Sequence, residues 1–113
     1  MEITMKIKPL SVNDAWKGRR YKSDEYKRYE HALLLLLPKI KLPEPPYRVS
    51  FEFGFSNTAA DFDNPVKPLT DILQKKYGFN DKEILEATIR KINVIKGQEY
   101  FKVTIENLFN NSK

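Results

Sequence analysis

The chain has 113 residues, enough for one domain with a single core. Apolar residues make up 41% of it and charged residues 31%, a balance typical of globular rather than disordered proteins. It has no cysteine and one histidine, which excludes disulfides, zinc knuckles, iron–sulfur clusters and histidine-rich metal sites. The net charge of +5 favours a polyanionic partner such as nucleic acid, although a solvated basic surface has the same composition.

The first half of the chain predicts a strand, a loop and a helix. Alternating apolar residues indicate a strand over residues 2–8, which Pro9 ends. Residues 11–22 are polar and basic, and we expect a loop there. Ser23 is placed to cap a helix that ends before Pro38. The residues expected on the apolar face of this helix are Tyr26, Tyr29, Ala32, Leu33, Leu36 and Leu37, whereas His31 is expected on its surface.

The second half predicts two further strands around a second helix, and then a last strand. Residues 39–46 hold three prolines and form an extended linker. Residues 47–55 alternate strictly and predict a half-buried strand. A helix is expected to start at Asp63 or Asn64 and to end at Gly78. Beyond it we expect a strand that includes Leu85, Ala87 and Ile89, in which the phase slips toward Ile92 and Val94. This slip indicates either a bulge or a strand buried on both faces. A hairpin turn at 96–98 then leads to Phe101, Val103 and Ile105.

The element order is therefore strand, helix, strand, helix, strand, strand. This order predicts an α+β (mixed α/β) fold with a mixed or mainly antiparallel sheet and two helices. We expect residues 1–107 to form one domain and residues 108–113 to form a polar tail. The chain starts without a basic-then-apolar leader, and its longest apolar run, residues 32–37, is too short to span a bilayer. We therefore expect a soluble, cytoplasmic protein that makes no contact with membranes.

The candidate site is a group of carboxylates around the start of the second helix. Asp61, Asp63, Asp71 and Asp81 gather within a short part of a basic chain, although like charges repel. A divalent cation among them would explain the grouping, because Mg²⁺ prefers carboxylate oxygens, waters and phosphates as ligands. Asp61 and Asp63 are two apart in an extended segment and would project to one side, so both can hold one ion. Asp81 could add a third ligand if its strand lies beside the preceding one.

A purely structural role for these acids is also open. Asp63 and Asn64 could cap the helix while Asp61 and Asp81 are solvated turn residues. A calcium-binding EF-hand loop is excluded. The positions that follow Asp61 hold Pro65, Val66 and Ile72 where such a loop needs an oxygen ligand, a glycine and a glutamate.

Lys67 follows the acids in the first turn of the predicted helix. Its ammonium group could offset charge that develops on a phosphate, or pair with an aspartate, or be an ordinary surface group. Asp71 is four residues further on and shares a helix face with Lys67, so we expect it to position the lysine rather than to bind metal.

The loop before the first helix interleaves aromatic and basic residues. Such a surface can clasp phosphates and stack on unpaired bases. The alternative is a solvated basic face on which Trp16 is a core anchor. The candidate DNA-binding residues are Asn13, Trp16, Lys17, Arg19, Arg20 and Lys22.

These motifs together resemble the RusA family of Holliday junction resolvases over most of the chain. The acidic part of the resemblance is Asp61-x-Asp63-Asn64-x-x-Lys67-x-x-x-Asp71-x-Leu73, followed by Gly78-Phe79-x-Asp81-x-x-Ile84. The N-terminal part is Pro9-x-Ser11-x-Asn13-x-x-Trp16-Lys17, followed by Tyr21-Lys22-Ser23-x-x-Tyr26. One departure is Asn80, at a position where members of the family often carry a second acid before Asp81.

The resemblance implies a homodimeric endonuclease that requires Mg²⁺, with Mn²⁺ as a possible substitute, and resolves four-way DNA junctions by paired nicks in recombination and repair. It implies that Asp61, Asp63 and Asp81 are the metal ligands, that Lys67 is catalytic, and that the protein acts in a bacterial cell or a phage-infected host. Two other functions stay open: a non-catalytic module that binds branched DNA, and a nuclease for other branched structures such as flaps.

Overall fold

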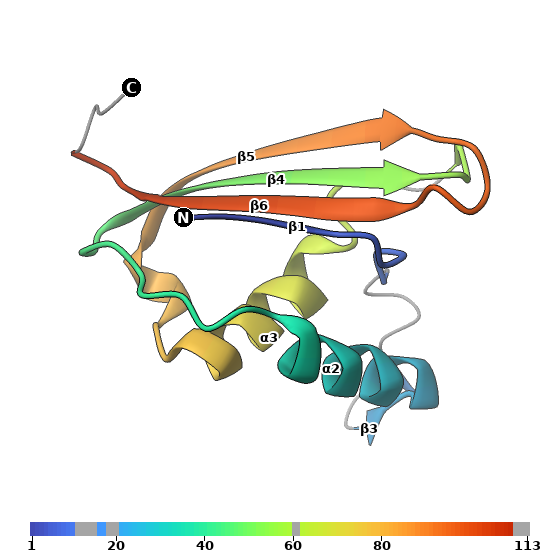
Figure 1. Ribbon diagram of the computed structural model, residues 1–113, viewed down its shortest axis with the longest axis horizontal. Helices are drawn as coiled ribbons and strands as arrows, with labels where there is room; N and C mark the ends of the chain where they lie inside the picture. Colours follow the sequence, from blue (N-terminus) through green and yellow to red (C-terminus); the bar gives the residue numbers. More distant parts are fainter. Residues whose placement is uncertain (11–15, 18–20, 60–61, 110–113) are drawn as a thin grey trace.

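The computed structural model describes residues 1–10, 16–17, 21–59 and 62–109. Its main feature is a four-stranded sheet with two helices on one face (Figure 1). Strand β4 pairs in parallel with β5, and the other two pairings are antiparallel. The predicted α+β fold with a mixed sheet and two helices is therefore confirmed. In the sheet order the strands are β1 (Glu2–Met5), β6 (Tyr100–Asn107), β4 (Tyr47–Phe55) and β5 (Ile84–Asn93), and the helices are α2 (Asp24–Leu36) and α3 (Val66–Tyr77).

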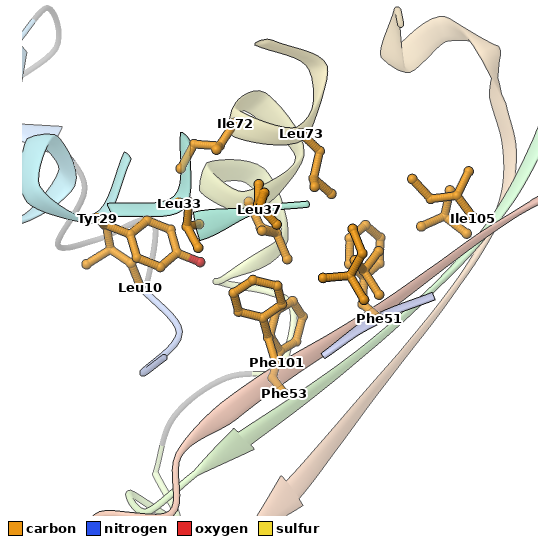
Figure 2. Packing of buried hydrophobic residues seen from close by; sticks show 14 of the residues in the cluster. Leu10, Tyr29, Leu33, Leu37, Phe51, Phe53, Ile72, Leu73, Phe101 and Ile105 are labelled. Carbon is orange, nitrogen blue, oxygen red and sulfur yellow. The ribbon is translucent and has the colours of Figure 1, made fainter. Parts of the chain in front are cut away.

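The core lies between the two helices and the sheet (Figure 2). The strict alternation predicted for residues 47–55 is confirmed, because every second side chain of β4, from Tyr47 to Phe55, points into this layer and is buried. Aliphatic side chains of α3 cover them from the other side. Burial of such side chains from water stabilises each by about 1.5–3 kcal/mol, which makes this layer the main source of stability.

Helix α2 begins and ends as its sequence predicts. The Ser23 hydroxyl accepts a hydrogen bond from the Tyr26 amide at 3.0 Å, so the predicted cap is confirmed. His31 is exposed, as expected. The expectation that Leu36 lies on the buried face is wrong, because its side chain is 60% exposed. Residues 32–37 are all apolar, so they surround the helix, and the sheet and α3 cover only one side of it. Leu35 and Leu36 are therefore left exposed.

The predicted hairpin between the last two strands is wrong. Strand β5 pairs with β4, and β6 lies on the other side of β4, between it and β1. The connection over residues 94–99 therefore crosses the end of β4, a step of about two strand spacings or 10 Å. The alternation of apolar residues identifies strands but does not say which strands are neighbours.

Three local expectations also differ from the structure. Strand β1 ends at Met5 rather than at residue 8. The expected loop contains two short paired strands, β2 (Trp16–Lys17) and β3 (Tyr21–Lys22). The irregularity in β5 lies at its start, where Leu85 has no partner on β4, and not at the phase slip near Ile92.

None of the helices in the described ranges is long and apolar enough to cross a membrane.

Candidate functional site

Helix α3 begins without a side-chain hydrogen bond from its N-cap residue. Pro65 occupies its N-cap position and has no side-chain acceptor. The backbone carbonyl of Asp63 accepts a hydrogen bond from the Val66 amide at 3.1 Å. The Asp63 carboxylate is exposed, and no described residue donates a hydrogen bond to it or forms an ion pair with it. The capping role that was one interpretation of Asp63 is therefore not observed, and its carboxylate is available to a ligand.

Lys67 and Asp71 form the pair that their spacing predicts. The Lys67 ammonium lies 3.0 Å from an Asp71 carboxylate oxygen, one turn apart on α3. The Lys67 side chain is 61% exposed, so its charge is accessible to a phosphate next to Asp63. An exposed pair of this kind contributes at most about 0.5 kcal/mol to stability.

Asp81 lies in a short turn that other polar side chains hold in place. The turn is a 3₁₀ helix, η1 (Asp81–Glu83), between α3 and β5. Asn80 caps it, because its side chain accepts from the Lys82 amide at 2.9 Å while the Glu83 carboxylate accepts from the Asn80 amide at 3.1 Å. The Asp81 amide donates to the Gln74 side chain at 2.7 Å. Asn80, which departs from the family pattern, thus supports the turn that presents Asp81.

The structure brings Lys67 and Asp71 into contact, and both follow Asp63 closely in the sequence. Asp63 and Asp81, in contrast, are separated. Asp63 precedes α3 and Asp81 follows it, and 12 helical residues span about 18 Å. Strand β5 does lie beside β4, which was the condition set for Asp81 to add a ligand. However, the two strands are parallel, so Asp81 comes before the start of β5 while Asp63 comes after the end of β4. Asp61, the remaining proposed ligand, lies outside the described residues.

The carboxylates of Asp63 and Asp81 are of the ligand type that a hard divalent cation prefers, but the two do not lie together within one chain. Asp63 and Asp81 are both exposed carboxylates, the ligand type that Mg²⁺ prefers. Within the described ranges, which leave out Asp61, no three acidic or histidine side chains form a group able to hold a metal ion. A complete ligand set therefore needs Asp61 or groups that come from another molecule.

Of the candidate DNA-binding residues, only Lys22 has a described side chain. Its ammonium group lies 3.1 Å from Glu30 and 4.9 Å from the centre of the Tyr26 ring. Burial, followed by the charges of Asp71 and Glu30, raises the pKa of Tyr26 to about 12. For Trp16 and Lys17 the structure gives the pairing of β2 with β3. Asn13, Arg19 and Arg20 lie outside the described residues.

The sequence analysis did not identify the two ion pairs of Glu30, which link α2 to β3 and to α3. Glu30 on α2 pairs with Lys22 at 3.1 Å and with Lys75 on α3 at 2.8 Å. Burial alone would raise the pKa of Glu30, but hydrogen bonds from Lys75 and Lys22 outweigh it and hold that pKa below the ordinary value. The sequence carried no local signal for the second pair, because Lys75 and Glu30 are 45 residues apart.

Comparison with known proteins adds no family assignment. The chain matches no family model, and no curated protein matches it.

Proposed function

We propose that this protein is a Mg²⁺-dependent endonuclease that resolves four-way DNA junctions by hydrolysing phosphodiester bonds. The motifs that resemble the RusA family suggest the activity. The observation that supports it most is the exposed Asp63 carboxylate, which bonds to no residue in the described ranges, since an acid kept at the start of α3 only for capping would bond to the helix amides.

In this proposal the protein is a homodimer, and each metal site takes Asp61 and Asp63 from one copy and Asp81 from the other, because α3 stands between Asp63 and Asp81 within one chain. The metal would supply activation of water and stabilisation of the leaving oxygen. Lys67 places a positive charge next to these acids, where it stabilises the negative charge that develops on the phosphate. Asp71 holds Lys67 in position at 3.0 Å. The basic residues of the N-terminal segment contact the DNA backbone, so binding weakens as salt is added.

The test is cleavage of a labelled four-way junction by the purified protein, with Mg²⁺ and with EDTA. We expect cleavage only with Mg²⁺, and a loss of at least about 100-fold in the Asp63→Asn variant. Asp24→Asn, a change of an exposed acid on α2, is the matched control and should cleave like the parent. Undiminished cleavage by Asp63→Asn would remove the catalytic assignment, and binding without cleavage by the parent would favour the non-catalytic module. Flap substrates tested in parallel identify a nuclease for other branched DNA.

A further inference from the structure

Two segments that lie far apart in the sequence carry lysines but no acids. Residues 31–43 contain no aspartate or glutamate, and neither do residues 72–80. The first segment covers the end of α2 and the linker that follows it, and the second covers the later part of α3 and the turn beyond it. Any surface that these two segments share is therefore basic.

The structure brings the two segments side by side. The linker that leaves α2 passes the last turn of α3 (Figure 1). The Tyr77 hydroxyl donates a hydrogen bond to the Pro38 carbonyl oxygen at 2.7 Å, and the Lys76 ammonium donates to the Leu34 carbonyl oxygen at 3.0 Å. Leu37, between these two acceptors in the chain, is buried in the core. These contacts hold the end of α2, the linker and α3 together, so the surface between them is formed before a partner arrives.

An open hollow of about 420 Å³ lies between the linker and α3. Its lining combines two apolar groups with three ammonium groups and consists of Lys39, Ile40, Lys41, Lys76 and Tyr77. Within the described ranges, none of these three lysines forms an ion pair, whereas Lys75, the fourth lysine of the two segments, pairs with Glu30. Ammonium groups without an acidic partner favour an anionic ligand.

The end of α2 adds exposed apolar surface just before the linker. Leu35 and Leu36 are 71% and 60% exposed, and they precede Lys39 by four and three residues. Exposed apolar surface rimmed by charged residues marks sites of protein or membrane binding. The DNA backbone is charged and polar, so it would use the lysines but not the leucines. A peptide that carries both acidic and apolar side chains uses both.

We propose that the linker surface, defined as residues 35–41 and 76–77, binds a short acidic peptide of another protein. An apolar side chain of the peptide fills the hollow against Ile40 and Tyr77, and the carboxylates beside it meet Lys39 and Lys41. An extended peptide of about six residues spans about 20 Å, which allows it to reach the leucines of α2 as well. The proposal does not depend on the nuclease activity, because none of these residues belongs to the candidate metal or DNA site.

The composition of the linker surface sets the strength of binding to expect. The surface is small, so we expect a transient complex with a Kd on the order of 10 μM. Lys39 and Lys41 are exposed, and salt screens charges in contact with water. Added salt should therefore weaken the complex, although burial of the apolar side chain should keep part of the affinity.

The test is fluorescence anisotropy of the full chain with a labelled octapeptide that has two central phenylalanines and three aspartates on each side. We expect a loss of affinity of about tenfold or more when serines replace both phenylalanines, because the apolar contact is removed. The serine peptide keeps every charge, so it measures the general attraction of an acidic peptide to a chain of net charge +5. Absence of binding at about 1 mM of the phenylalanine peptide, or equal binding of both peptides, overturns the proposal.

Protein variants locate the binding. Lys39→Gln/Lys41→Gln removes two charges from the linker surface and should weaken binding of the phenylalanine peptide by about tenfold. Lys6→Gln/Lys8→Gln is the matched control, since it removes two exposed lysines of the same spacing from another part of the chain. This control should bind the peptide like the parent. Equal weakening in both variants would mean that only the net charge matters, and it overturns the assignment of the surface.

DNA and anionic membranes are the two other possible partners of this surface, and the same variants distinguish them. Lys39→Gln/Lys41→Gln should match the Lys6→Gln/Lys8→Gln control in its affinity for a labelled four-way junction and in its sedimentation with phosphatidylglycerol vesicles. A loss of DNA or vesicle binding confined to Lys39→Gln/Lys41→Gln would assign the linker surface to that partner and overturn the proposal. Failure of the parent to cleave a junction removes the proposed nuclease function but leaves these measurements unaffected.

Discussion

Asp63 and Asp81 lie beyond opposite ends of helix α3, whose 12 residues span about 18 Å. This relationship follows from the parallel pairing of β4 and β5, because the crossover helix returns the chain to the end of the sheet where β4 began. Asp63 and Asp81, which flank a single helix in the sequence, therefore lie toward opposite ends of the pair of strands β4 and β5. Any joint use of them requires a second molecule or a long ligand.

Loss of the Lys67 charge should reduce activity but not stability. We expect Lys67→Met to cleave a four-way junction about 100-fold more slowly than the parent, because one stabilising charge near the phosphate is lost. Its free energy of unfolding should change by less than about 0.5 kcal/mol, since the pair with Asp71 is exposed. Single-turnover cleavage and urea unfolding measure the two effects. Lys96→Met, in an exposed turn, is the control, and normal cleavage by Lys67→Met would contradict the role.

Removal of the Glu30 charge should destabilise the fold and change its response to acid. Glu30→Gln loses ion pairs with Lys22 and Lys75, and we expect a cost of about 1–3 kcal/mol near pH 7. Because the folded pKa of Glu30 lies below its ordinary value of 4.5, its stabilising effect is present above that pH and is lost as the pH falls through the folded pKa.

Urea unfolding between pH 3 and pH 7 measures this difference. The parent and Glu30→Gln should approach each other in stability at the acid end of the range. Glu44→Gln, a change of an exposed acid in the linker before β4, should follow the parent at every pH. A constant gap between the parent and Glu30→Gln over the whole range would show that the charge of Glu30 is not the cause.

A methyl group at Gly54 should disturb the open face of the sheet. Gly54 pairs with Tyr100 on β6, and an added Cβ would lie 2.4 Å from two atoms of the Tyr100 ring. We expect Gly54→Ala to cost about 1–3 kcal/mol in unfolding free energy, because Tyr100 must move and its 2.5 Å hydrogen bond to Glu52 is lost. A double-mutant cycle with Tyr100→Ala isolates the clash. Additive effects of the two changes would contradict it.

The cap of α2 should contribute measurably to stability. Ser23→Ala removes the acceptor for the Tyr26 amide and should cost about 1 kcal/mol, measured by thermal or urea unfolding. Ser23→Asp keeps an acceptor at this position and serves as the control. We expect it to retain the parental stability, and an equal loss in both variants would mean that the hydrogen bond of the cap is not responsible.

The sequence by itself determined the two helices, the four strands of the main sheet and several contacts between residues close in the chain. The alternation in β4, the Ser23 cap, the Gly78 end of α3 and the pair of Lys67 with Asp71 follow from periodicity and from interactions within a few residues. Such features depend on local backbone geometry and on side chains a few residues apart, so a pattern in the sequence is enough to identify them.

Only the tertiary structure decided which strands are neighbours, and with it how far the acids of the candidate site lie from one another. The alternation of β5 and β6 is the same whether they form a hairpin or lie on either side of β4. The placement depends on how the helices cover the sheet, which involves contacts between residues far apart in sequence. That choice makes β4 and β5 parallel, separates Asp63 from Asp81 and leaves β5 at the edge.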